Sequence, residues 1–225
     1  MDERMRQSVI AKLHNQHKGE RLFIMGVGPS LNDIPKDLLV RVARNEAIFG
    51  CNFLMRWGKI PHSAPLYWAV AESDVITHVH ESLLLRGMRP LKFYSNQLQL
   101  NAPPDWVYIR SGDAGSVEDM QQGYVSGLGD VLEPVGGNSG SVIGLMIQLG
   151  LWMGFDPIYL LGCDASVEGH AYEDVLIVPR KRQDSFQRSA LAAYQAMKKA
   201  GRTLIDLTEG GTLPVPKGRL GDVLK

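Results

Sequence analysis

Seven short apolar runs recur along the chain and set the pattern of its fold. They cover residues 21–26, 47–52, 66–72, 91–96, 106–112, 157–164 and 202–208. Most of these runs are nearly continuous rather than alternating, which is typical of strands that are buried on both faces of a parallel sheet. The pattern therefore predicts a buried, mostly parallel sheet.

Helical periodicity fills several gaps between these runs. The clearest pattern covers residues 139–153, with Ser139 as the expected N-cap, and a second covers 184–200. Residues 74–86 and 3–17 are also expected to be helical. Alternating strands and helices predict the α/β class, with one Rossmann-like sheet covered by helices on both faces.

The domain organisation follows from the same pattern. Residues 1–20 are expected to form a peripheral N-terminal helix or arm, and residues 21–225 a Rossmann-like nucleotide-binding domain. With 225 residues and 44% hydrophobic content, the chain is long enough for one well-buried domain.

The composition argues against several kinds of partner and site. Lys+Arg and Asp+Glu both number 24, so no global basic field favours nucleic acid as a partner. Cys51 and Cys163 are too few for a disulfide framework or a zinc set. The charged N-terminus does not resemble a signal peptide and no apolar run reaches the length of a transmembrane segment, so a cytoplasmic protein is expected. The protein could form a homo-oligomer.

The first strand is followed by the loop Gly26-Val27-Gly28-Pro29-Ser30-Leu31. Its glycines allow close approach to a ligand, and Ser30 is suited to cap a helix or to bind a phosphate. Three features disfavour NAD: Leu31 stands where that fingerprint has Gly or Ala, Asn52 replaces the acidic residue after the second strand, and Pro29 lacks an N–H donor. The alternative to a nucleotide site is a tight turn.

Two further stretches suggest anion or metal contacts. The segment Gly136-Gly137-Asn138-Ser139-Gly140-Ser141 leads into a helix start, whose dipole favours a phosphate or carboxylate; the alternative is a linker with a capping serine. After the third strand, Glu72 or Asp74 could line the cleft; the alternative is that Ser73 or Asp74 only caps the helix over 74–86, which is the commoner role.

The sixth run ends in another group of polar residues. Asp164 follows a strongly apolar strand, so its carboxylate must be solvated or hydrogen-bonded at the mouth of the sheet. His170 and Tyr172 are candidates for proton transfer or phosphate contacts, although a loop histidine is more often an ordinary surface residue. Arg180, Lys181 and Arg182 form either a solvated patch or a contact for phosphate or an acidic acceptor.

These motifs resemble one known group. The segments "MGVGPSLNDIP…IFGCNFL", "GGNSGSVIGLMIQLGLWMGFDPIYLLGCDASVEGHAYED" and "LIDLTEGGTLPVPKGRLGDVL" are similar, in the same order, to motifs of the bacterial sialyltransferases that use CMP-sialic acid. They also resemble the flagellin-modifying (motility accessory factor) glycosyltransferases and the MptE-like pterin pyrophosphokinase-like domains. The resemblance covers most of the chain and implies a Rossmann-like fold.

The resemblance also implies roles for individual residues. Those expected around the nucleotide or its sugar are Gly26, Gly28, Pro29, Ser30, Asn52, Asn138, Ser139, Gly140, Ser141 and Gly162. Asp164 would hold the ribose or cytosine side, and Tyr172 would hydrogen-bond the leaving phosphate. The sialyltransferases need no metal, because tyrosine hydroxyls and backbone donors stabilise the departing nucleotide.

The sequence differs from the sialyltransferases at one position that matters for the reaction. The sialyltransferases have a histidine base in the lid, near the position of Arg182, whereas no histidine follows His170 here. The leading hypothesis is a metal-independent, inverting glycosyltransferase that uses a CMP-linked donor and an unknown acceptor, with His170 as the base. The alternatives are an ATP-dependent pyrophosphokinase, with Mg²⁺ held by Asp164, Asp74 or Glu72, and a nucleotide-binding module without turnover.

Overall fold

The structure is a computed structural model. It describes residues 3–71, 75–95, 103–109, 141–165, 169–172 and 180–225. No helix in these segments is long and apolar enough to cross a membrane.

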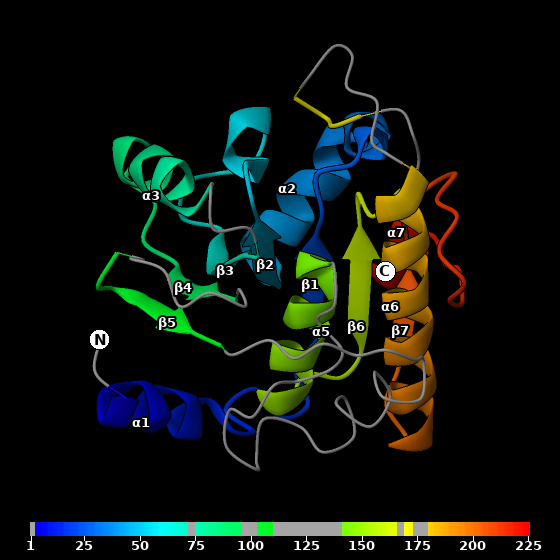
Figure 1. The fold of residues 1–225 in the computed structure, drawn as a ribbon. Helices are drawn as coiled ribbons and strands as arrows, with labels where there is room; N and C mark the ends of the chain where they lie inside the picture. The colour runs from blue at the N-terminus through cyan, green and yellow to red at the C-terminus, as the bar shows by residue number, and fades with distance from the viewer. Residues whose placement is uncertain (1–2, 72–74, 96–102, 110–140, 166–168, 173–179) are drawn as a thin grey trace.

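The core of the fold is one seven-stranded sheet (Figure 1). Its strands are β1 (Leu22–Met25), β2 (Ala47–Cys51), β3 (Pro65–Val70), β4 (Leu91–Tyr94), β5 (Trp106–Tyr108), β6 (Ile158–Leu161) and β7 (Leu204–Asp206). Every pair of neighbours is parallel, in the order β5-β4-β3-β2-β1-β6-β7. The prediction of a buried parallel sheet is confirmed.

Six helices and two 3-10 turns are present in the described segments. They are α1 (Glu3–Leu13), α2 (Lys36–Asn45), α3 (Ile76–Leu85), α5 (Val142–Trp152), α6 (Arg180–Lys199) and α7 (Leu220–Val223), with 3-10 turns η1 (Pro29–Asp33) and η2 (Leu54–Trp57). The expectation that Ser139 is the N-cap of the helix over 139–153 is wrong. The cap of α5 is Ser141, whose Oγ accepts from the N–H of Ile143 at 3.2 Å.

Helices cover both faces of the sheet. Alternate residues of each strand point to opposite sides and therefore contact different helices. On β1, Leu22 and Ile24 pack in a cluster with residues of α1, α5 and α6, whereas Phe23 and Met25 pack with residues of α2, α3 and α7. Helix α5 crosses the middle of the first face (Figure 1). This doubly wound arrangement leaves the strand ends as the places where loops meet.

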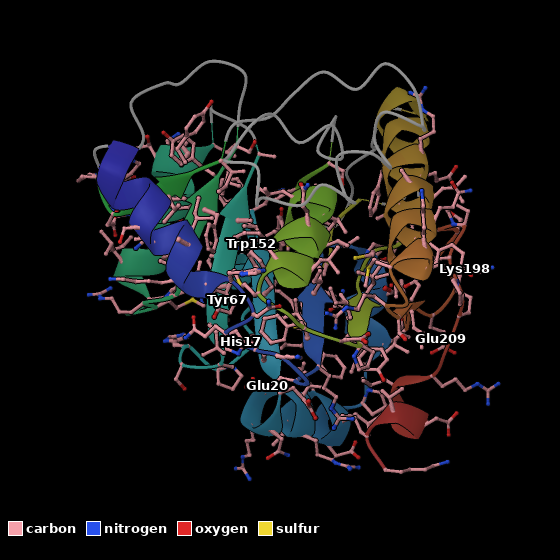
Figure 2. The ribbon with its side chains drawn as sticks, turned by 90° about the horizontal axis from the view of Figure 1, so that it is seen from below. His17, Glu20, Tyr67, Trp152, Lys198 and Glu209 are labelled. Carbon is pink, nitrogen blue, oxygen red and sulfur yellow. The ribbon has the colours of Figure 1, made fainter. Side chains whose placement is uncertain are left out.

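The chain between α1 and β1 is tied to the amino ends of the strands, as Figure 2 shows from below. The indole N–H of Trp152 donates to the carbonyl of Ile10 at 2.8 Å. The ring of His17 stacks on Phe155 at 4.3 Å, and its Nε2 lies 2.5 Å from the hydroxyl of Tyr67. Burial raises the pKa of Tyr67 to about 12. Helix α1 is therefore anchored through its C-terminal half.

The outer edge of β7 is covered by the residues that follow it. The N–H of Asp206 donates to Pro216 at 2.8 Å, and the N–H of Gly218 donates to Asp206 at 3.0 Å. The carboxylate of Asp206 is fully buried and accepts from the N–H of Thr208 at 2.9 Å and from the ammonium of Lys217. An ion pair with a buried carboxylate thus holds this C-terminal strap, residues 207–218, against the sheet.

Candidate functional site

The carboxyl ends of β1 and β6 lie where the strand order of the sheet reverses, which is where open α/β sheets bind ligands. The glycine loop (residues 26–31) follows β1 and runs beside the segment that follows β6. The N–H of Gly26 donates to Leu161, and that of Gly28 to Gly162, both at 2.8 Å. Two of the predicted loops therefore meet at the expected ligand-binding edge.

The glycines of this loop are required by the protein's own packing. A Cβ on Gly28 would overlap the carboxylate of Asp164, and a Cβ on Gly26 would overlap the carbonyl of Gly162. Gly162 itself has a φ of 63°, in the left-handed region. Pro29 begins η1, where its missing N–H costs no hydrogen bond. Close approach of the two loops accounts for Gly26 and Gly28, whereas backbone conformation accounts for Gly162 and Pro29.

Asp164 joins the two loops directly. Its Oδ1 accepts from the N–H of Ser30 at 3.0 Å, and its Oδ2 accepts from the hydroxyl of Ser30 at 2.8 Å. Burial raises the pKa of Asp164, although both hydrogen bonds from Ser30 act in the opposite direction. Ser30 does not cap a helix with its hydroxyl but is held by this carboxylate. Each oxygen of Asp164 therefore already accepts one hydrogen bond from Ser30.

We expect Asp164→Asn to alter how stability depends on pH. Because its pKa is raised above 3.8 in the folded protein, Asp164 binds its proton more tightly there than in the unfolded chain. The wild type must therefore lose stability relative to the variant as pH rises above 3.8, until the folded carboxyl has ionised. Asparagine can still accept from the N–H and donate to the hydroxyl of Ser30, so the variant should fold.

The measurement is urea unfolding of both proteins from about pH 3.5 to 7. Asp222→Asn is the control with the opposite sign: the hydrogen bond from Lys225 lowers the pKa of Asp222, so its contribution is lost as pH falls. If the free energy of unfolding changed with pH in the same way in wild type and Asp164→Asn, the raised pKa of Asp164 would be contradicted.

The turn after Asp164 is held by the C-terminal strap. Ala165 has a φ of 51°, which is costly for a residue with a Cβ. The N–H of Thr212 donates to the carbonyl of Asp164 at 3.1 Å, and its hydroxyl lies 3.2 Å from that of Ala165. The hydroxyl of Thr208 accepts from the N–H of Cys163 at 3.1 Å. The sequence analysis missed Thr212, since nothing in the local pattern marks a residue 48 positions from Asp164.

His170 and Tyr172 lie together beside the glycine loop. Their rings stack with centroids 5.2 Å apart and planes 8° from parallel. Between them, the N–H of Ala171 donates to Val27 at 2.8 Å and its carbonyl accepts from Asn32 Nδ2 at 3.1 Å. The structure thus brings both predicted residues to the site, and it adds Asn32, which the sequence analysis missed.

Asn52 lies at the carboxyl end of β2, one strand away. Its backbone has a φ of 44°, its N–H donates to Ala69 at 3.1 Å, and its carbonyl accepts from the indole of Trp68 at 3.1 Å. Its side-chain Oδ1 is buried and has no hydrogen-bond partner within the described part of the chain. An unpartnered buried acceptor is costly, and at the ligand-binding edge of a sheet it suggests a ligand donor.

The other predicted contacts are only partly described. Ser141 is buried and caps α5, so its hydroxyl already serves the helix start. Arg180 and Arg182 lie in the first turn of α6, and only their backbone is described. The predicted residues that lie outside the described segments are Glu72, Asp74, Asn138, Ser139 and Gly140. Among the described residues, no group of three His, Cys, Asp or Glu side chains is placed to hold a metal ion.

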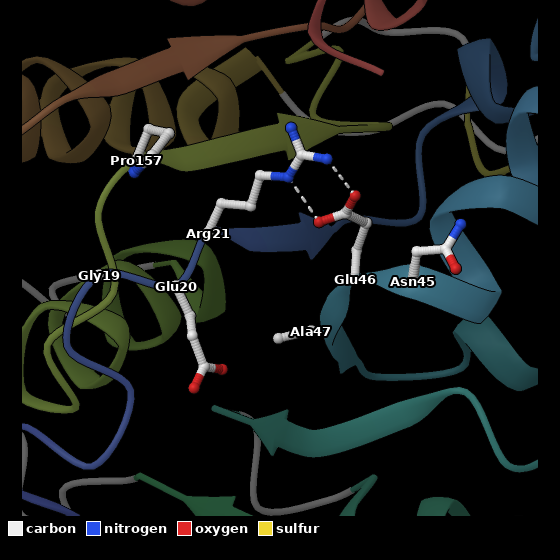
Figure 3. Close-up of a pocket in the computed structure, with 7 residues that line it drawn as sticks. All are labelled: Gly19, Glu20, Arg21, Asn45, Glu46, Ala47 and Pro157. Atoms are coloured by element: carbon white, nitrogen blue, oxygen red, sulfur yellow. Dashed lines mark hydrogen bonds and ion pairs between the residues drawn. The ribbon is translucent and has the colours of Figure 1, made fainter. Parts of the chain in front are cut away.

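A cavity of about 550 Å³ lies at the opposite, amino end of the strands (Figure 3). Its charged groups already have partners within the protein. Arg21 donates to both oxygens of Glu46, at 2.6 and 2.5 Å, and to the carbonyl of Val223 at 2.7 Å. Glu20 is 2.9 Å from Nδ1 of His17. The carboxyl edge, where Oδ1 of Asn52 has no partner among the described residues, is therefore the stronger candidate for a ligand site.

Neither cysteine is a candidate nucleophile. Both thiols are fully buried. Burial raises the pKa of Cys51 to about 12 and raises that of Cys163 well above its ordinary value. A reactive cysteine needs an accessible thiolate, so these thiols belong to the core.

The fold is similar to that of solved glycosyltransferases. The MAf glycosyltransferase from Magnetospirillum magneticum AMB-1 superposes with a TM-score of 0.58 and 11% identity, over 96% of this chain and 38% of that one. Sialyltransferase CstII from Campylobacter jejuni, in complex with the substrate analogue CMP-3FNeuAc, gives 0.56 and 15%, over 89% of this chain and 87% of that one. The same sialyltransferase, with a trisaccharide acceptor and CMP, gives 0.54 and 16% over the same shares.

The chain has the fold of these glycosyltransferases. The expected resemblance to the sialyltransferases and to the motility accessory factor glycosyltransferases is confirmed at that level. The chain spans less than two fifths of the length of the Magnetospirillum protein. No protein-family model matches the sequence, and no curated protein matches it.

Proposed function

We propose that this protein is a glycosyltransferase that binds a nucleotide-activated sugar, with a CMP-linked nonulosonic acid as the favoured donor. The observation that carries the proposal is the buried Oδ1 of Asn52, which has no partner among the described residues and lies beside the strand-order reversal at β1 and β6. This acceptor suits an amino group of cytosine or a ribose hydroxyl. Support comes from the sialyltransferase of the same fold, which was solved with CMP.

In this proposal, the acceptor hydroxyl attacks the anomeric carbon of the donor as the bond from that carbon to the phosphate oxygen breaks. CMP leaves with the bonding electrons, the anomeric configuration inverts, and the hydroxyl proton passes to a base, for which His170 is the candidate. The hydroxyl of Tyr172 and the start of α5 stabilise the leaving phosphate, so no metal is required. Asp164 and Ser30 hold the glycine loop in shape.

The first test is a thermal-shift panel of CMP, CDP, UDP, ATP and NAD, each with and without Mg²⁺. A ligand at 100 times its Kd stabilises the folded state by about 2.7 kcal/mol, so binding is readily seen. Selective stabilisation by CMP or CDP without metal supports the proposal. Stabilisation by ATP only with Mg²⁺ would favour pyrophosphoryl transfer instead, and CMP binding without hydrolysis of a CMP-sugar would indicate a non-catalytic module.

We expect Asn52→Gly to weaken CMP binding about tenfold, the loss of roughly one hydrogen bond to a buried group. Glycine adopts the φ of 44° without strain, so the variant removes the carboxamide and keeps the backbone bonds to Ala69 and Trp68. The measurement is isothermal titration calorimetry.

Asn15→Gly is the matched control, because Asn15 has a similar φ of 56° but lies next to α1, at the amino end of the strands. It should leave CMP affinity unchanged. Equal affinity of wild type and Asn52→Gly would remove Asn52 from the pocket and the main support of the proposal.

A further inference from the structure

Lys59 brings a positive charge to the edge where the proposed site lies. It follows η2, which begins shortly after the end of β2, and its side chain is exposed. The ammonium donates to Oδ1 of Asn32 at 3.0 Å and lies 5.3 Å from the ring centre of Trp57. The indole N–H of Trp57 donates to the same oxygen at 2.9 Å. Oδ1 of Asn32 therefore accepts from both Lys59 and Trp57.

The carboxamide of Asn32 connects this charge to the loop that carries the stacked aromatic pair. Its Nδ2 donates to the carbonyl of Ala171 at 3.1 Å, while its Oδ1 accepts from Lys59. Ala171 in turn donates to Val27 in the glycine loop at 2.8 Å. One side chain therefore separates the ammonium from the backbone between His170 and Tyr172.

A phosphate bound between these loops requires positive charge nearby, and the described neighbours supply little else. Asp164 contributes a carboxylate, and Arg56 stacks 4.0 Å from the ring centre of Phe53 instead of reaching Asn32. An ammonium has three N–H donors, and the structure records one of those of Lys59 in use among the described residues. The remaining donors face solvent on an exposed side chain, where an oxyanion can reach them.

We infer that Lys59 binds a phosphate oxygen of the nucleotide, and that Asn32 positions it for that contact. This inference rests on the proposed function in placing a nucleotide at the carboxyl edge. The ammonium would add a full positive charge to the hydrogen bonds by which Tyr172 and the start of α5 stabilise the phosphate as CMP leaves.

The test compares cytidine with CMP by calorimetry at low ionic strength, for wild type, Lys59→Gln and Lys59→Arg. Lys59→Gln should weaken CMP binding about tenfold and leave cytidine binding unchanged, because only CMP carries the phosphate. Lys59→Arg should retain most of the CMP affinity. The affinity of wild type for CMP should also fall more steeply with added NaCl than that of Lys59→Gln. Lys198→Gln, at an exposed lysine on the last turn of α6 (Figure 2), should match wild type throughout.

The outcomes separate this inference from the proposed function. If wild type binds CMP and Lys59→Gln binds it equally well, the lysine contact is overturned and the function stands. An equal loss for cytidine and CMP would also overturn the contact, since Lys59 would then act only by supporting the loop. If wild type binds ATP instead of CMP, and Lys59→Gln weakens ATP but not adenosine, the contact stands and the cytidine specificity falls. Binding of neither nucleotide would overturn both.

Discussion

Replacing Lys217 by methionine is expected to lower the free energy of unfolding by about 3 kcal/mol. The ammonium of Lys217 pairs with Asp206, whose carboxylate is fully buried, and also donates to the carbonyl of Gly211 at 2.8 Å. Removing it leaves a buried charge with the N–H of Thr208 as its described partner. The value lies at the low end for a broken buried pair because Lys217 is itself 44% exposed, so that water reaches the ammonium.

Urea unfolding of three variants tests this expectation. The double variant Asp206→Asn/Lys217→Met should recover most of the stability, since the uncompensated charge is removed while an acceptor for Thr208 is kept. Lys225→Met is the matched control: Lys225 pairs with Asp222 on the surface, and its loss should leave the unfolding midpoint unchanged. If the double variant were as unstable as Lys217→Met, the buried charge would not be the cause.

The second large effect is expected at the glycine loop. Gly28→Ala places a methyl group where Oδ2 of Asp164 now lies, close also to the carbonyl of Gly162. One of the two loops must move, and the hydrogen bonds between Asp164 and Ser30 are lost or distorted. We expect a loss of about 2–3 kcal/mol in stability. CMP affinity should fall by about tenfold or more, since each 1.4 kcal/mol lost from binding is a factor of ten.

The control for this substitution is Gly221→Ala. Gly221 lies within α7, and the nearest atom to a Cβ there would be Cδ1 of Leu38 at 4.0 Å. Alanine favours a helix over glycine by about 1 kcal/mol, so this variant should be as stable as wild type or more so. Both stabilities are measured by urea unfolding, and CMP binding by calorimetry. Wild-type stability and affinity in Gly28→Ala would mean that the two loops do not pack as closely as the structure has them.

The strands could be predicted from sequence because they are buried on both faces. A run such as "PIYLLGCD" has no polar residue to accommodate before Asp164, and β6 lies within it at Ile158–Leu161. Helix α2 was missed, although Leu38, Leu39, Val42 and Ala43 recur at helical spacing and pack in the core cluster on one face of the sheet. The start of α5 was placed too early because Ser139 and Ser141 are equally good caps by residue type.

The candidate site was predictable only in outline. The glycine loop, Asn52 and Asp164 stand out because each follows a strand, and parallel strands bring their carboxyl ends to one edge. What those residues do to one another could not be read from the sequence. The two hydrogen bonds from Ser30 to Asp164 join positions 134 residues apart, and Asn32 meets Ala171 across 139 residues. Such pairings depend on the register of the whole sheet.

The position of β1 between β2 and β6 has a consequence for folding. Strand β1 can pair with β2 as soon as residues 47–51 are available, but its other partner, β6, lies at residues 158–161. Contacts that close such long loops form slowly, because the chain entropy is lost before the contact is gained. On the ribosome, the first half of the sheet can therefore assemble while the edge beside the glycine loop is still open. The ability to bind a ligand at this edge would therefore come late in folding, after β6 has paired with β1.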